Sequence, residues 1–167
     1  MSRRELTSDR LRELLSYDLN SGVFTRLVKT SNRIKIGDVA GYKNPIGYCE
    51  ISADGISYFA HRPAWLYVTN VWPIGMIDHI NRDRGDNRFV NLRDVSNTEN
   101  QQNISEARKT NPVGILGVQA SGRVSNPWMA RIRINGVQTF IGNFKSAELA
   151  HSAYLEAKRA NHKGSTI

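Results

Sequence analysis

The sequence predicts an α+β protein built from two units, each with a small antiparallel sheet. Three observations lead to this class. Short β-prone runs cut by glycines fill residues 23–60, a strand, loop, strand and helix follow in order from 76 to 108, and a hairpin followed by a helix lies between 128 and 162. The 167 residues suffice for one ordinary domain or two small ones, and an apolar content of 40% is enough to build cores.

The first elements follow from caps, apolar spacing and turns. Thr7 precedes a run in which Leu11, Leu14 and Leu15 share one face, so we expect a capped helix that ends before residues 20–22. The Asp54-Gly55 pair marks a turn. The β-prone runs around it imply one small antiparallel sheet from residues 23–25, 38–41, 48–52 and 56–60.

The middle of the chain predicts a compact motif. Residues 61–70 form a helix that tolerates Pro63 in its first turn. A strand over 76–80, a polar loop over 81–88 and a second strand over 89–95 follow. Ser96 with Glu99 three residues later is a capping box, so we expect a third helix from 97 to about 108.

Residues 109–114 form a polar linker containing Pro and Gly, and a second unit begins near residue 115. Strict alternation from Trp128 to Ile134 places Arg131 and Arg133 on one strand face. Asn135-Gly136 is a hairpin turn. It pairs 134 with 137, 133 with 138, 132 with 139 and 131 with 140. Ser146 caps a helix whose alanines form a stripe that can lie against the sheet.

The charge favours a polyanionic partner, nucleic acid before an acidic membrane surface. Lys and Arg number 23 against 15 Asp and Glu, giving a net charge of +8. Residues 1–100 carry 14 basic and 12 acidic side chains, and residues 101–167 carry 9 and 3, so the excess is +2 and +6. Basic residues and tyrosines between 26 and 58 form either a binding surface or an ordinary solvated sheet face.

Two classes of protein are excluded by composition. A single cysteine, Cys49, forms neither an internal disulfide nor a thiolate zinc cluster, which fits a reducing, intracellular location. No apolar stretch approaches the ~18 residues of a membrane span. We therefore expect a soluble protein without a membrane partner.

One segment carries residues typical of nuclease chemistry. In order it contains Asp78-His79-Ile80-Asn81, Asn87-Arg88, Asn91-Leu92-Arg93 and Glu99-Asn100. This combination resembles the HNH endonuclease signature of the phage and intron-encoded (homing) type, over about residues 61–103. The resemblance implies a ββα-metal nuclease module.

Elementary chemistry agrees with that resemblance. Hydrolysis of a phosphodiester needs a water, a base to deprotonate it and a cation to neutralise developing charge. His79 suits the base, since histidine titrates near neutral pH. Asp78 and Asn100 offer hard oxygen ligands for one Mg²⁺, with Mn²⁺ able to substitute. Asn103 is a weaker ligand candidate.

The resemblance also sets a geometric condition. Neighbouring side chains of a regular strand point to opposite faces, so Asp78 and His79 reach one phosphate only if the strand end is irregular, as in the family. By resemblance Asn91 ties the two strands and orients the His79 imidazole, and we place it in the catalytic set. A turn asparagine is the alternative.

The remaining histidines have weaker claims. His61 and Arg62 match a recurring pair upstream in the family: Arg62 could reach the scissile phosphate and joins the catalytic set. For His61 a helix cap, a DNA contact and catalysis stay open, and we assign it to DNA binding. His151 on the last helix and His162 in a frayed tail are expected to be structural, and no two histidines have zinc-ligand spacing.

Residues 114–162 resemble the AP2 DNA-binding domain, through Gly117-Val118, the 128–133 strand, Asn135-Gly136, the 140–144 run and the 147–154 helix. The resemblance implies a three-stranded antiparallel sheet that reads the major groove, backed by one helix. It assigns DNA contacts to Gln119, Arg131, Arg133, Gln138 and Phe140. The first strand departs from the family, with Leu116, Gln119 and Ser121 in place of arginines.

The sequence thus predicts a metal-dependent DNA endonuclease that nicks or cuts both strands at a recognised site. Residues 1–108 form the nuclease domain with its N-terminal helix and sheet, 109–114 the linker, and 115–167 the AP2-like domain. Double-stranded DNA is the expected partner, in a bacterial host cytoplasm for a phage-encoded protein. A monomer is favoured, although the sequence does not fix the oligomeric state. An inactive sequence-specific DNA-binding regulator and an RNA-binding or structural protein are the alternatives.

Overall fold

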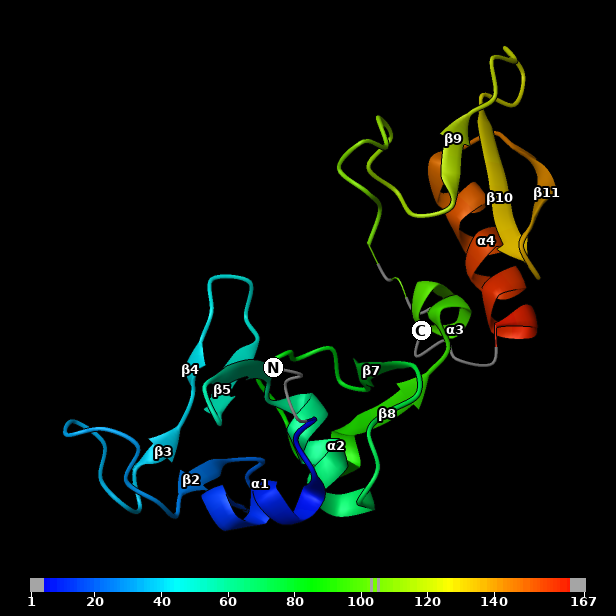
Figure 1. Ribbon diagram of the computed structural model, residues 1–167. Helices are drawn as coiled ribbons and strands as arrows, with labels where there is room; N and C mark the ends of the chain where they lie inside the picture. Colours follow the sequence, from blue (N-terminus) through cyan, green and yellow to red (C-terminus); the bar gives the residue numbers. More distant parts are fainter. Residues whose placement is uncertain (1–4, 103, 105, 163–167) are drawn as a thin grey trace. The chain divides into compact units, whose positions relative to one another are not determined.

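A computed structural model describes residues 5–102, 104 and 106–162, and the chain divides into two compact units, Met1–Ser96 and Asn97–Ile167. The division falls before the linker predicted at 109–114. Residues after 103 are drawn into the second unit, because Lys158 Nζ donates to the Ile104 carbonyl and Asn111 Nδ2 donates to the Ile115 carbonyl. The α+β class is confirmed, with several small antiparallel sheets (Figure 1).

The N-terminal unit contains two three-stranded sheets where one was predicted. The expected helix is present as α1, Ser8–Leu14, and the Thr7 side chain caps it by accepting from Arg10 N. The first sheet has the order β1-β2-β3 and the second β4-β5-β6. Their strands are β1 (Leu15–Tyr17), β2 (Phe24–Arg26), β3 (Val39–Ala40), β4 (Tyr42–Lys43), β5 (Cys49–Ala53) and β6 (Ile56–Phe59).

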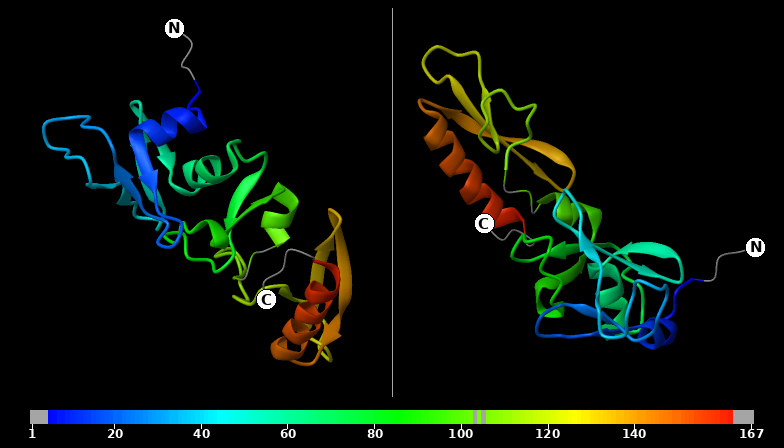
Figure 2. Two further views of the ribbon diagram at one scale, coloured as in Figure 1. Left: turned by 90° about the horizontal axis from the view of Figure 1, so that it is seen from below. Right: turned by 90° about the vertical axis from the view of Figure 1, so that its left-hand side faces the viewer.

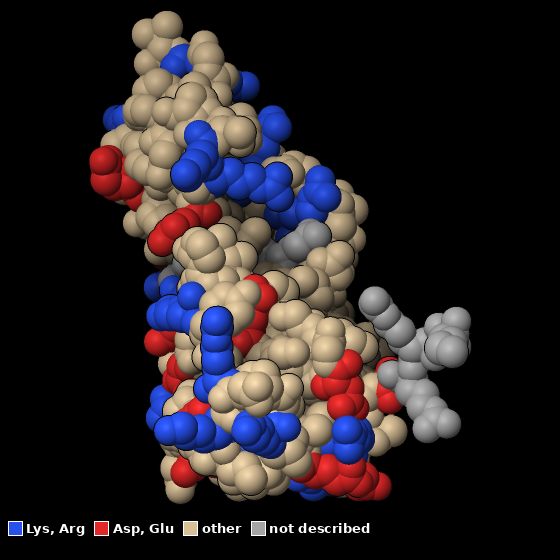
Figure 3. Space-filling view, turned by 60° about the vertical axis from the view of Figure 1, so that its left-hand side comes forward, with Lys and Arg blue, Asp and Glu red and all other residues tan. Residues whose placement is uncertain are grey.

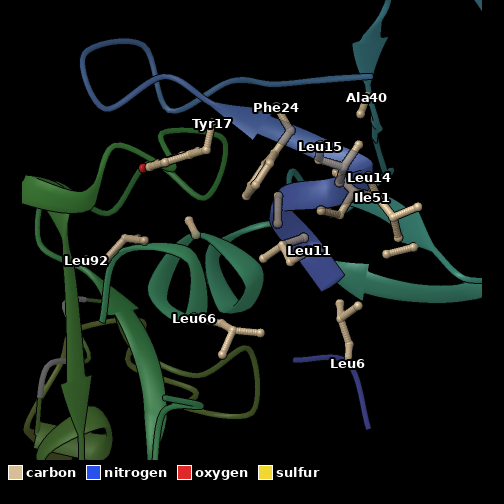
Figure 4. Packing of buried hydrophobic residues seen from close by; sticks show 13 residues of the cluster. Leu6, Leu11, Leu14, Leu15, Tyr17, Phe24, Ala40, Ile51, Leu66 and Leu92 are labelled. Atoms are coloured by element: carbon tan, nitrogen blue, oxygen red, sulfur yellow. The ribbon is translucent and has the colours of Figure 1, made fainter. Parts of the chain in front are cut away.

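The core of this unit lies where the two sheets meet α1 and α2, His61–Thr69. Leu11 and Leu15 are fully buried, and Phe24, Ile51 and Leu66 reach them from β2, β5 and α2 (Figure 4). Burying such a side chain contributes about 1.5–3 kcal/mol. This core fixes the positions of β5 and α2. Tyr48, directly before β5, and His61, the first residue of α2, contact His79.

The predicted strand, loop, strand and helix are present with two corrections. The hairpin pairs β7, Met76–His79, with β8, Leu92–Val95. Residues Phe89–Asn91, predicted as strand, form a 3-10 turn because the Asn91 side chain is committed to the preceding loop. Helix α3, Asn97–Gln102, ends before the predicted residue 108, since the Ile104 carbonyl accepts from Lys158 instead of a helical N–H.

The C-terminal unit has the predicted sheet and helix. Strands β9 (Val118–Ala120), β10 (Trp128–Ile134) and β11 (Val137–Phe144) form an antiparallel sheet in the order β11-β10-β9. All four predicted pairs across the Asn135-Gly136 turn are confirmed, and a bulge follows beyond Arg131. Helix α4, Ala147–Asn161, is capped by Ser146 and lies along one sheet face (Figure 2). None of the described helices combines the length and hydropathy of a membrane span.

Gly117 provides a stability test for this unit. It has φ +77°, and a Cβ there would lie 2.1 Å from the Tyr154 ring. Gly122 has a similar φ of +73° with open space around it. A substitution at Gly122 therefore measures only the free-energy cost of a side chain at positive φ. We expect Gly122→Ala to lower the free energy of unfolding by about 1 kcal/mol and Gly117→Ala by about 2–4 kcal/mol, because overpacking is added to the backbone cost.

Urea unfolding monitored by circular dichroism measures both variants. Equal losses would contradict the close approach of Gly117 to Tyr154.

Candidate functional site

Asp78 and His79 are the last two residues of β7 and lie on opposite faces of the two-stranded hairpin. Asp78 is paired across the ladder with Arg93, and His79 with Leu92. His79 is buried at 4% exposure, whereas Asp78 is half-buried. The regular strand ends here, because Arg82 N donates to the His79 carbonyl and Arg82 adopts φ +66°. The regular ladder therefore includes both Asp78 and His79, and the chain turns away only after His79.

The Asp78 carboxylate is bound by Arg93 across the hairpin. Arg93 Nε and Nη2 donate to Asp78 Oδ2 at 2.9 and 2.7 Å, and both side chains are largely shielded from solvent. Both of these bonds end on the same carboxylate oxygen. A carboxylate is a hard donor of the kind that Mg²⁺ prefers, so the chemistry of Asp78 fits the predicted ligand role.

His79 lies in an aromatic environment. The His61 and His79 rings make an edge-to-face contact with centroids 5.1 Å apart, and the Tyr48 ring lies 6.1 Å from His79. Burial lowers the pKa of His79; the nearby Asn87 amide opposes this shift without reaching hydrogen-bond geometry, as do the carboxylates of Asp78 and Asp86. The imidazole is held neutral, the form that accepts a proton.

The Nε2 atom of His79 is buried and has no hydrogen-bond partner in the described part of the chain. Such atoms are rare in folded proteins, because leaving a buried polar atom unpaired costs about 1–3 kcal/mol. A bound water or a phosphate group would supply the missing partner.

Asn91 fixes the backbone that follows His79. Its carbonyl accepts from Ile80 N, its Oδ1 accepts from Asn81 N at 2.9 Å, and its Nδ2 donates to the Asp86 carbonyl at 2.9 Å. The residue is buried at 6% exposure. These bonds join the residue directly before β8 to the segment that follows β7. Any orienting effect of Asn91 on His79 would act through this backbone.

The 81–88 loop is ordered by its own polar side chains. Asn81 Nδ2 donates to Asp86 Oδ2, and Arg88 donates through Nε and Nη2 to the same carboxylate at 2.8 and 2.6 Å. Arg88 is the main cause that lowers the pKa of Asp86 to about 2. The Tyr17 hydroxyl donates to the Asn87 carbonyl at 2.7 Å and anchors the loop to β1.

His61 occupies a different environment from the one predicted. It is 6% exposed, its ring stacks on Phe59 at 16°, and burial lowers its pKa to about 4. A DNA contact through this side chain is not supported, because the ring has almost no accessible surface. Its neighbour Arg62 lies over the Trp72 ring at 5.7 Å, and its catalytic role stays a prediction.

Other predicted residues are placed as follows. Asn100 is on α3, in the C-terminal unit, and its ligand role stays a prediction. Asn103 lies outside the described residues. His151 Nδ1 bonds the Leu116 carbonyl, and His162, predicted in a frayed tail, is buried with Nε2 bonded to the Arg133 carbonyl. Within the described residues no three His, Cys, Asp or Glu side chains form a metal cluster.

The C-terminal sheet presents a polar face opposite α4. Arg131 pairs with Phe140 and Arg133 with Gln138 across the hairpin, and all four side chains are exposed. Gln119 joins this face through its pairing with Met129. A groove of about 610 Å³ is lined in part by these residues: Gln119, Arg131, Arg133 and Gln138. The structure brings together the predicted DNA-contact residues of this unit. Lys and Arg side chains are visible on both units in Figure 3.

Three residues of the N-terminal site were not predicted. Arg93 and Asn87 stood in the recognised signature without a role, and strand pairing with Asp78 was the signal that could have assigned Arg93. Tyr48 lies directly before β5, far from His79 in the sequence. No local sequence pattern links it to His79.

Comparison with known proteins identifies the segment that holds these residues. Residues 58–102, from the end of β6 through α3, match the family model described as HNH endonuclease. No curated protein and no solved structure matches the chain significantly. The segment that contains Asp78, His79 and Asn91 is therefore an HNH endonuclease domain, and this family comprises phosphodiester hydrolases.

The pKa of His61 makes stability depend on pH. The folded value of about 4 lies below the ordinary 6.5, so the unfolded chain binds the proton first as pH falls. Stability conferred by neutral His61 is complete above pH 6.5 and declines toward pH 4, at up to about 1.4 kcal/mol per pH unit. His61→Phe keeps a stacked ring without this titration and should lose less stability between pH 7 and 5.

Urea unfolding at both pH values checks this expectation. An equal loss in wild type and variant would show that His61 is not held neutral.

Proposed function

We propose that the protein is a divalent-metal-dependent DNA endonuclease in which His79 is the general base. One observation carries the proposal: within an HNH domain, His79 presents a buried, neutral imidazole with an unpartnered Nε2, and the preceding residue of the same strand is Asp78. A neutral imidazole next to a phosphate-binding site can accept the proton of an attacking water. Asn91 supports this geometry by holding the backbone at residues 80 and 81.

Asp78 and Asn100 would hold the metal ion, with Mg²⁺ as the preferred species and Mn²⁺ as a substitute. When bound, such an ion neutralises charge on the phosphate and on the leaving oxygen. Arg93 holds the Asp78 carboxylate in place through their ion pair. Arg62 is a candidate phosphate contact.

We further propose that the C-terminal unit is an AP2-like DNA-binding domain. A metal site acts on a phosphate that all DNA shares, so selectivity requires contacts to base edges elsewhere. Arg131 and Arg133 are exposed two residues apart on β10, and arginine pairs bidentately with guanine. Gln138, Phe140 and Gln119 extend the same face. The pairing of a cutting module with a separate reading module supports site-directed cleavage of the homing type.

Cleavage is tested on supercoiled plasmid with Mg²⁺, with nicked and linear products separated by electrophoresis. His79→Ala should fold and bind DNA normally but cut at least about 10²-fold more slowly, the usual size of a general-base contribution. His151→Ala is the matched control, because that ring lies in the other unit, where it bonds the Leu116 carbonyl and stacks on Tyr154. Asp78→Ala and excess chelator should both abolish cutting.

Undiminished cutting by His79→Ala would refute the base assignment. Cutting in excess chelator would refute the metal requirement. A wild-type protein that binds DNA and never nicks it would be an inactive regulator, and efficient cleavage of RNA over duplex DNA would contradict the substrate.

The reading face is tested in the full-length protein. The double variant Arg131→Ala, Arg133→Ala should lose about 1–3 kcal/mol of binding per lost base contact on a cognate duplex and less on a scrambled one. Lys145→Ala, Arg159→Ala removes the same charge from this unit away from the β10 face. Binding by fluorescence anisotropy at fixed salt compares the two.

An unchanged preference for the cognate duplex in the first variant would place specificity outside this sheet.

A further inference from the structure

We propose that Lys43 and Arg84 form a binding site for a DNA backbone phosphate beside the phosphate that is cut. The inference rests on the proposed function, because it takes the substrate strand to pass His79. It assigns a substrate-holding role to the N-terminal unit, in addition to the basic sheet face of the C-terminal unit.

Arg84 is connected to His79 through one aromatic ring. Its guanidinium lies over the Tyr48 ring at 5.0 Å, and the same ring lies 6.1 Å from the His79 imidazole. Arg84 Nη1 donates to the Ile46 carbonyl at 3.1 Å, which fixes the group on the ring. The side chain is exposed, and its other nitrogens face no acidic partner among the described residues. An arginine held in this way keeps donors for an incoming anion.

Lys43, at the end of β4, converges on the same place. A Cβ on Gly85 would lie 3.2 Å from Lys43 Nζ, and a Cβ on Gly47 would contact both Lys43 and Arg84. The two cations therefore flank the tips of the 44–47 and 83–85 turns. Lys43 also lines a hollow of about 490 Å³ together with Arg88, Asp83 and Asp86, and Arg84 is not among the residues that line it.

The neighbouring carboxylates leave a positive balance. Asp86 is neutralised by Arg88, with which it forms an ion pair at 2.6 Å. Asp83 accepts the Gly85 N–H through Oδ1 and is the remaining acidic group of the loop. Lys43 and Arg84 carry two positive charges against this one carboxylate, so their sum is +1.

The spacing favours a nucleic-acid backbone as the ligand. Phosphates of one strand follow each other at about 3.4 Å along the duplex axis, so a strand with its scissile phosphate at His79 carries the next ones close by. Tyr48 separates Arg84 from His79 by a single ring, which matches a contact to a neighbouring phosphate and not to the scissile one. Such a contact positions the strand without reading its sequence.

The test measures binding of the full-length protein to a short random-sequence duplex in chelator, by fluorescence anisotropy across a range of salt concentrations. The variants are Arg84→Ala, Arg84→Lys and Lys43→Ala. Arg10→Ala is the matched control, since it removes an exposed charge of the same unit that Asp54 and Glu13 already hold. Thermal melting confirms that each variant is folded.

Arg84→Ala and Lys43→Ala should each reduce the slope of log affinity against log salt by about 1, the effect of one lost phosphate contact. Arg84→Lys should retain most of the slope, and Arg10→Ala should match wild type. The proposal is overturned if Arg84→Ala behaves like Arg10→Ala. It is also overturned if Arg84→Lys fails as fully as Arg84→Ala, which would assign Arg84 to packing on Tyr48.

The assay needs no cleavage, so its failure is distinct from that of the proposed function. A protein that binds with the expected slopes and never cuts would contradict the nuclease proposal alone. A protein that cuts normally while slopes are unaffected by Lys43 and Arg84 would contradict this inference alone.

Discussion

The N-terminal unit is organised around two adjacent residues of one strand that need different surroundings. Because side chains alternate along β7, Asp78 and His79 point to opposite faces of the hairpin. The Asp78 face is completed by Arg93 from the partner strand. The His79 face is closed by rings from other elements, Tyr48 at the edge of β5 and His61 at the start of α2. Strand β8, the residue before β5 and the start of α2 therefore all contribute side chains around the end of β7.

The chain leaves the strand directly after these two residues. The turn at 79–82 and the Asn91 side chain fix this departure, since Asn91 bonds to both Asn81 and Asp86. The loop is in turn anchored from β1 by the Tyr17 hydroxyl. A polar loop of this length would be mobile in isolation, and the buried amide of Asn91 gives it a fixed geometry.

The features that the sequence predicted correctly are those determined by residues close together in the chain. The hairpin register at Asn135-Gly136 and the caps at Thr7 and Ser146 are set by neighbours in the chain, and they are confirmed. The HNH segment was recognised because its polar residues recur at fixed spacing. The contact of Lys158 with Ile104 joins residues far apart in the chain and left no local signal in the sequence.

What the sequence could not show depends on contacts between distant segments. His61 was assigned to DNA binding because His61 and Arg62 match a recurring pair in the family, yet the ring is buried and contacts Phe59 and Tyr48. Strand prediction across Phe89–Asn91 failed because a buried side-chain amide outweighed β-propensity. The contact between Arg84 and Tyr48 joins residues from a loop and a strand that no periodicity relates.

The central claim is that Asp78 and His79 act together on one DNA phosphate with a metal ion. A crystal structure of the protein with duplex DNA and Mn²⁺, located by anomalous scattering, tests it most directly. The account predicts one ion bound by Asp78 and Asn100, with His79 Nε2 directed at a water in line with the scissile phosphate. An ion bound elsewhere, or a His79 imidazole still enclosed by Tyr48 and His61 and away from the DNA, would contradict it.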